Sequence, residues 1–139
     1  NYNNMKKTIF YSLLISILLL SFSCSREDDS STSNENKQKL IGKWYFADPA
    51  TYGYSTNNSF TFTSDGKVTY SYWAGGSGSG FDSETGTYSI EGDVLRMVYS
   101  QNVTLTFVQK VVFLSDKKVQ FIETGKPNEE PYDGTYYKE

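Results

Sequence analysis

Residues 59–73, SFTFTSDGKVTYSYW, contain two strand-like runs joined by a short polar turn. Aromatic residues, Thr and Val are common in both runs, and such residues favour β-strands. The turn Ser64-Asp65-Gly66-Lys67 contains a glycine that can adopt the positive φ required by a tight hairpin. The stretch therefore predicts an antiparallel β-hairpin.

The same alternation of strand-like runs and small polar turns extends to the C-terminus. The eight runs are residues 40–46, 59–63, 68–73, 85–90, 94–99, 103–114, 119–124 and 134–138. No segment of residues 40–139 has a convincing helical period. Eight sequential antiparallel strands predict an all-β fold, either an up-and-down β-barrel or a strongly curled sheet, because closure removes exposed strand edges.

The period of two also predicts which side chains point into the barrel. If Trp44 points inward, Leu40 and Phe46 share its face. The other inward positions are largely aromatic or branched: Phe60, Phe62, Val68, Tyr70, Tyr72, Tyr88, Ile90, Leu105, Phe107, Val111, Phe113, Val119 and Phe121. The interior of an eight-stranded barrel is either filled by side chains or holds one small ligand. The many aromatic residues among these inward positions favour a filled interior. The alternative is an open pocket lined by Tyr70, Tyr72, Trp73 and Tyr88.

The N-terminal part has the order of a secretory signal. Lys6 and Lys7 precede an apolar run over residues 9–20, and Ser23 stands before Cys24, the single cysteine. The run is shorter than the roughly 20 apolar residues of a membrane span, and its flanks match a cleaved signal peptide. We expect residues 1–23 to be a signal peptide with a short N-terminal extension, and we expect the thiol of Cys24, which follows it, to be modified. The alternative is an ordinary signal peptide or a buried helix, with Cys24 an unmodified stray thiol.

Residues Ser21-Phe22-Ser23-Cys24 resemble the lipobox of bacterial lipoproteins. This resemblance implies that Cys24 carries acyl chains such as palmitate, which anchor the protein in a membrane. The cluster Glu27-Asp28-Asp29 resembles the export signal that sends some lipoproteins to the outer face of the outer membrane. A solvated charge run is the alternative interpretation of the cluster.

Residues 24–39 separate the lipid site from the first predicted strand. After Cys24, this segment contains no aromatic or aliphatic residue. Such a segment cannot bury enough apolar surface to offset the entropy lost on ordering. We therefore expect a flexible lipidated tether over residues 24–39, followed by one barrel domain over residues 40–139.

The charge balance and the missing residue types limit the function. Without Lys6 and Lys7 the chain has 11 basic against 16 acidic residues, which argues against binding nucleic acid. The sequence contains no histidine and its thiol is assigned to lipid, so Ser-His pairs, Cys-His pairs and common zinc sites are excluded. Asp82 and Glu84 are expected to be solvated charges in a glycine-rich loop. We expect a monomeric protein that is not an enzyme and binds no metal or cofactor.

Several short motifs resemble the small lipocalin-like domains of bacterial surface lipoproteins. They are Leu40-Ile41-Gly42-Lys43-Trp44, Phe60-Thr61-Phe62 with Asp65-Gly66-Lys67-Val68, and Gly86-Thr87-Tyr88 with Gly92-Asp93-Val94-Leu95. The resemblance covers most of residues 40–138. It implies a lipocalin-like barrel that binds a small apolar or amphiphilic ligand, with structural roles for Gly42 and Trp44.

The chain departs from the secreted lipocalins at one position with a structural role. In lipocalins a basic residue near the end of the barrel covers the first-strand Trp. Neither Arg26 nor Arg96 lies there, and Lys138 is a weak substitute. The short chain and its missing disulfides argue against a deep cavity.

The alternative function is a surface interaction module with a filled barrel. It would bind a protein or glycan through the exposed aromatic residues Tyr52, Tyr54, Trp73 and Phe81.

Overall fold

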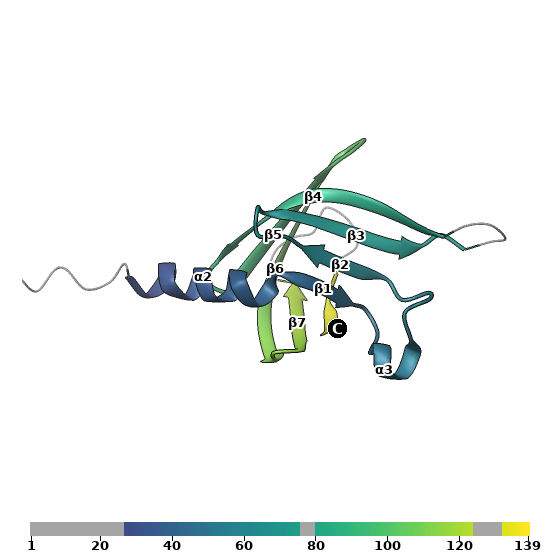
Figure 1. Cartoon of the computed structure of the whole chain (residues 1–139). Coiled ribbons are helices and arrows are strands. Elements are labelled where there is room, and N and C mark those ends of the chain that lie inside the picture. The colour runs from purple at the N-terminus through teal and green to yellow at the C-terminus, as the bar shows by residue number, and fades with distance from the viewer. Residues whose placement is uncertain (1–26, 76–79, 124–131) are drawn as a thin grey trace, which may run out of the picture.

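Eight strands form one closed antiparallel barrel in the computed structural model, which describes residues 27–75, 80–123 and 132–139 (Figure 1). The strands are β1 (Gly42–Tyr45), β2 (Ser59–Phe62), β3 (Lys67–Trp73), β4 (Phe81–Glu91), β5 (Val94–Ser100), β6 (Thr104–Ser115), β7 (Lys118–Glu123) and β8 (Gly134–Lys138). Each strand pairs with the next in sequence, and β8 pairs with β1. The predicted up-and-down barrel is therefore confirmed, and the curled open sheet is excluded.

Aromatic and branched side chains fill the inside of the barrel, because alternate strand residues point to one face. The buried cluster consists of Leu40, Trp44, Phe60, Phe62, Val68, Tyr88, Ile90, Leu95, Met97, Tyr99, Phe107, Val111, Val119, Phe121 and Tyr136. Ring contacts join many of its members. For example, the rings of Phe121 and Tyr136 lie 4.6 Å apart.

Strand β4 begins earlier than the sequence pattern predicts. Phe81 pairs with Trp73, so the ladder between β3 and β4 continues to the end of β3. Asp82 and Glu84 therefore lie in a strand, and their assignment to a loop is wrong. Pairing along the full length of β3 outweighs the low strand propensity of their side chains.

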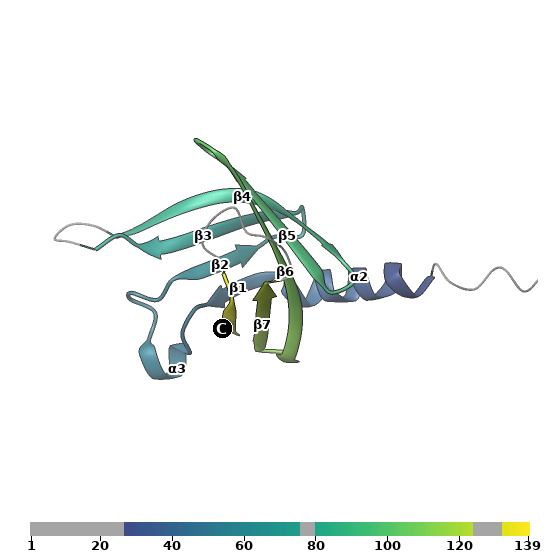
Figure 2. The same cartoon turned by 180° about the vertical axis from the view of Figure 1, so that it is seen from behind.

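A helix, α2 (Glu27–Leu40), occupies most of the segment expected to be a flexible tether. The Ser33 hydroxyl accepts a 2.6 Å hydrogen bond from the Gly92 amide, and the Asn36 amide donates a 2.8 Å bond to the Gly92 carbonyl. These bonds attach the helix to the turn between β4 and β5. The prediction of a flexible segment is wrong over residues 27–39, because long-range polar contacts and the buried Leu40 replace the missing apolar stripe. Seen from both sides, the N-terminal half of α2 extends beyond the barrel (Figures 1 and 2).

A second helix, α3 (Pro49–Tyr52), follows β1 where no helix was expected. The Asp48 side chain accepts a 3.0 Å hydrogen bond from the Ala50 amide, and Pro49 occupies the first turn. Both features favour a helix start. The buried Asn57 side chain bonds both backbone groups of Ala47 and so ties the connection after α3 back to the end of β1.

The signal segment and Cys24 lie outside the described residues. In the described ranges, no helix is long and apolar enough to cross a membrane. Every described element and contact lies within residues 27–139, which therefore contain the whole barrel together with α2.

Candidate functional site

The barrel has two different ends. The turns after β2, β4 and β6 lie at one end together with α2, and this end is called the closed end. The opposite end, called the mouth, contains the C-terminal ends of β3 and β5 and the first residues of β4, β6 and β8. The predicted site residues are divided between these two ends and the outer face.

Trp44 is fully buried at the closed end. Its indole nitrogen donates a 2.8 Å hydrogen bond to the carbonyl of Leu40, and the Lys138 ammonium lies 5.1 Å from the ring centre. Gly42 has a φ of +126°, and a Cβ there would lie 2.8 Å from the Lys138 Cε. The missing side chain at Gly42 thus leaves room for Lys138 to cover Trp44, so the expectation that Lys138 is a weak substitute is wrong.

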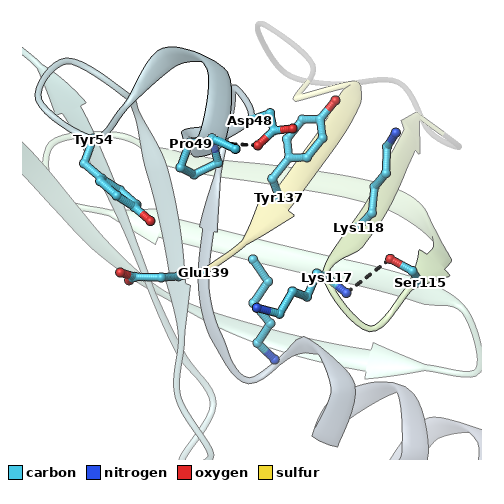
Figure 3. A pocket seen from close by; sticks show the side chains of 10 residues that line it. Asp48, Pro49, Tyr54, Ser115, Lys117, Lys118, Tyr137 and Glu139 are labelled. Atoms are coloured by element: carbon cyan, nitrogen blue, oxygen red, sulfur yellow. Dashed lines mark hydrogen bonds between the residues drawn. The ribbon is translucent and has the colours of Figure 1, made fainter.

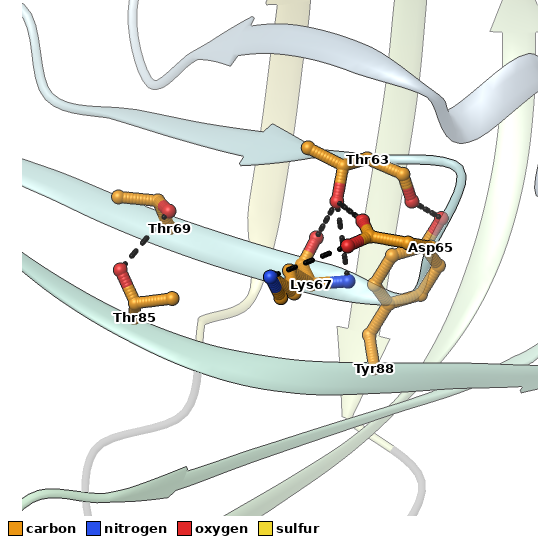
Figure 4. Close-up of polar contacts among 6 residues, drawn as sticks. All are labelled: Thr63, Asp65, Lys67, Thr69, Thr85 and Tyr88. Carbon is orange, nitrogen blue, oxygen red and sulfur yellow. Dashed lines mark hydrogen bonds and ion pairs between the residues drawn. The ribbon is translucent and has the colours of Figure 1, made fainter.

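Tyr88 lies at the closed end, beside Thr63 and Asp65 of the turn between β2 and β3 (Figure 4). Its hydroxyl donates a 2.8 Å hydrogen bond to the Thr63 carbonyl, at the turn between β2 and β3. Burial, and secondly the Asp65 carboxylate, raise the pKa of Tyr88. The Thr63 hydroxyl donates to Asp65 and lowers the pKa of that carboxyl, an effect to which Lys67 adds. Tyr88 therefore ties two parts of the closed end together and lines no mouth.

Trp73 lies on the outer face of the barrel. It is 40% exposed, and its ring centre lies 5.6 Å from that of Phe81, which is 44% exposed. The two residues are register partners at the end of the β3–β4 ladder. Trp73 consequently does not line the interior with Tyr70 and Tyr72.

Tyr70 and Tyr72 lie on the inward face near the mouth, with their ring centres 5.2 Å apart. Tyr132, which precedes β8, packs inside this end of the barrel. Its ring centre lies 5.4 Å from that of Tyr70, 5.0 Å from that of Phe60 and 4.8 Å from that of Phe107. These contacts fill the interior below the mouth with aromatic rings. Sequence reasoning missed Tyr132, because it follows a segment rich in proline and acidic residues that has no strand pattern.

Tyr99 places an unpaired polar atom in this aromatic interior. The residue is 3% exposed, and among the described residues its hydroxyl has no hydrogen-bond partner. A Cβ on Gly86 would lie 2.9 Å from the Tyr99 ring, so the ring occupies the space that Gly86 leaves free. Burial raises the pKa of Tyr99, and smaller effects of Tyr132 and the Glu84 carboxylate act in the same direction.

Gln109 supplies a second unpaired atom. The residue is 1% exposed, and its amide nitrogen donates a 3.4 Å hydrogen bond to the Asp133 carboxylate. In the described part of the chain, its side-chain oxygen has no donor. The sequence contained a signal for this residue, since Gln109 is the polar member of the inward series between Phe107 and Val111.

The depressions formed by the described residues include two that adjoin α3. The larger, about 430 Å³, lies between α3, the turn after β6 and the C-terminus (Figure 3). Its lining combines Lys117 and Lys118 with Asp48 and Glu139. The smaller, about 270 Å³, includes Tyr52, Asn57 and Phe46, and it borders the mouth because the Phe46 ring contacts that of Tyr70. The described residues contain no cluster of three acidic, Cys or His residues that could hold a metal ion.

The comparisons with known proteins agree with this architecture. A family model described as a lipocalin-like domain matches residues 40–121. The matched range begins with the buried Leu40 and ends within β7, so it includes Gly42, Trp44, Tyr70 and Tyr99. No curated protein matches the chain.

Proposed function

We propose that this chain, which belongs to the family of lipocalin-like domains, binds one small amphiphilic molecule at the mouth of its barrel. The pair of unpaired buried atoms, the Tyr99 hydroxyl and the Gln109 side-chain oxygen, is the observation that carries the proposal. A buried polar group without a partner costs about 1–3 kcal/mol. A bound molecule with a polar head can supply the missing partners.

The surrounding rings fit the apolar part of such a molecule. Tyr70, Tyr72 and Tyr132 form a continuous aromatic wall near the mouth. Deeper positions are occupied by Phe60 and Phe121, whose ring centres lie 6.3 Å apart. Ligand binding therefore requires the aromatic side chains near the mouth to move, because the two unpaired atoms are buried in the filled interior.

We also propose that the domain is not an enzyme. The described polar side chains around the two unpaired atoms are tyrosine hydroxyls, an amide and carboxylates. The sequence has no histidine to act as the base of a nucleophilic pair. These groups are suited to holding and orienting a ligand.

Membrane anchoring through an acylated Cys24 completes the proposal. The apolar run over residues 9–20 and the residues Ser21-Phe22-Ser23-Cys24 support it. Glu27, Asp28 and Asp29 then direct the lipoprotein to the outer face of the outer membrane. The 14 residues of α2 would hold the barrel up to about 21 Å from the anchor, at 1.5 Å per residue.

Titration with the neutral, environment-sensitive dye Nile red tests the binding role. Residues 25–139, which include every described contact, are used without lipid, and a cooperative melt checks their fold. We expect saturable one-to-one binding to the native domain, weakened by Tyr99→Phe. Trp73→Ala, which changes only the outer face, is the matched control. Dye binding that appears only after partial unfolding would contradict the proposal.

A surface interaction module is the second candidate function. The outward pair Trp73 and Phe81 favours it, because two exposed large aromatic rings in contact are typical of protein and glycan interaction surfaces. If this candidate is correct, Trp73→Ala weakens binding of the partner while Tyr99→Phe leaves it unchanged.

A further inference from the structure

The unpaired Gln109 oxygen needs a hydrogen-bond donor, whereas the unpaired Tyr99 hydroxyl can donate or accept. If the Gln109 amide were turned over, its oxygen would face the Asp133 carboxylate, and two acceptors would repel each other. The amide nitrogen therefore points at Asp133, and the oxygen remains the atom without a donor. A ligand group with N–H or O–H bonds fits this oxygen, whereas a carboxylate or sulfate does not.

The described charged groups on the inward face near the mouth are acidic. Glu84 is the register partner of Tyr70 and Asp82 is that of Tyr72, so both carboxylates lie on the face that bears these tyrosines. Asp133 adds a third carboxylate next to Gln109. Their combined field favours a cation over an anion.

Among the described residues, the basic side chains lie away from the inward face near the mouth. Among the inward strand positions whose burial is described, Lys138 is the single basic residue. It covers Trp44 at the closed end. Arg96 and Lys110 are exposed strand residues, and they point outward. Their neighbours in sequence point inward, namely Leu95, Met97 and Val111. The acidic groups at the mouth thus have no described inward cation to neutralise them.

The tyrosine rings near the mouth add a further attraction for a cation. A positive group within about 6 Å of an aromatic ring centre gains roughly 0.5–2 kcal/mol, depending on how far it is removed from water. The Tyr70 and Tyr72 rings lie 5.2 Å apart, so one small cationic head can contact both.

We infer that the polar head of the ligand is a protonated primary or secondary amine, an inference that rests on the proposed binding function. An N–H group of this head donates a hydrogen bond to the Gln109 side-chain oxygen. Its positive charge faces Glu84 and Asp133, and its apolar tail contacts the tyrosine wall.

Calorimetric titrations with three probes of equal chain length test this inference on residues 25–139. Decylammonium carries a charge and N–H donors, decyltrimethylammonium carries the charge alone, and decyl sulfate carries the opposite charge. All are used below their micelle concentrations. We expect decylammonium to bind tightest, about tenfold or more tighter than decyl sulfate, with decyltrimethylammonium between them.

Two charge variants on β4 locate the effect. Glu84→Gln removes the inward carboxylate and should weaken decylammonium binding about three- to tenfold, and it should weaken Nile red binding less, because Nile red is neutral. Glu91→Gln removes an outward, exposed carboxylate from the same strand and should change neither affinity. This pair of variants separates binding at the mouth from general attraction of cations to an acidic protein.

The outcomes separate this inference from the proposed function. If decyl sulfate or decyltrimethylammonium binds as tightly as decylammonium, or if Glu91→Gln weakens binding as much as Glu84→Gln, the amine head is refuted. One-to-one binding of Nile red in the same protein would still support the proposed function. If neither Nile red nor decylammonium binds the native domain, both proposals are wrong.

Discussion

The ammonium of Lys138 lies 5.1 Å from the centre of the Trp44 ring and donates a 3.1 Å hydrogen bond to the carbonyl of Lys39. One side chain from β8 thereby contacts β1 and the last turn of α2. The cation also caps the C-terminal end of the helix, where free carbonyl groups favour positive charge. This arrangement closes the end of the barrel opposite the mouth.

Lys138→Met tests the contribution of this cation to stability. The change keeps most of the apolar stem and removes both the cation–aromatic contact and the bond to Lys39. We expect the free energy of unfolding to fall by about 1–2 kcal/mol. Urea denaturation measures this change. Lys117→Met, in the exposed turn after β6, is the control and should change stability by less than about 0.5 kcal/mol. Equal effects of the two variants would show that Lys138 has no special role.

Tyr99→Phe has opposite effects on stability and binding. The hydroxyl is buried without a described partner, so its removal should leave the free energy of unfolding of the empty domain unchanged or raise it by up to about 1–3 kcal/mol. The same change removes a ligand contact and should weaken amphiphile binding. Tyr136→Phe is the control, because the Tyr136 hydroxyl donates a 2.8 Å bond to the Tyr132 carbonyl and its loss should destabilise. A marked loss of stability in Tyr99→Phe would contradict this account of the hydroxyl.

The stability of the domain should fall steeply above pH 10. Burial raises the pKa of both Tyr99 and Tyr136 above the ordinary value of 10.0. Above that pH the unfolded chain releases two protons that the folded chain keeps, so alkali favours unfolding. Each tyrosine adds a decrease of about 1.4 kcal/mol per pH unit, which is absent below pH 10. Urea denaturation between pH 9 and 11 should show that stability falls less steeply with pH in Tyr99→Phe than in the unchanged protein, and equal slopes would contradict the burial of this hydroxyl.

Cys24→Ser tests the proposed lipid anchor. Acyl chains are the proposed attachment to the membrane, so the variant should leave the membrane fraction and keep an uncleaved signal segment. Fractionation and intact mass measure both effects. A control variant that changes Glu27, Asp28 and Asp29 to Ala should remain acylated, and protease added to whole cells should no longer reach it. Membrane attachment of Cys24→Ser would refute lipidation at this residue.

The barrel could be predicted from the sequence because residues close together in the chain specify its strands and hairpins. Alternation in runs such as residues 68–73 and turn glycines such as Gly66 specify strands and hairpins from neighbouring residues. Helix α2 was missed because its contacts with Gly92 involve residues more than 50 positions away, and its own residues have no apolar stripe. The start of β4 was misplaced for a related reason, since pairing with β3 determines it.

The candidate site was only partly predictable. The phase of the strand correctly predicted that Tyr70 and Tyr72 share one face. Trp73 has the opposite phase, and Tyr88 lies at the other end of the barrel, so the sequence grouping combined three locations. The two unpaired atoms depend on which side chains meet inside the closed barrel. No single strand contains that information.

An NMR titration of residues 25–139 with decylammonium tests the central claim most directly. Amide chemical shifts should change along the mouth, at Tyr70, Glu84, Tyr99 and Leu105, with saturation at one ligand per chain. The chemical shifts of two other groups of amides should change little. One group lies on the strands next to the outward pair Trp73 and Phe81, and the other surrounds the surface depression at Lys117 and Glu139. Shift changes concentrated at that depression or on the outer aromatic face, with none at Tyr99, would contradict ligand binding at the mouth.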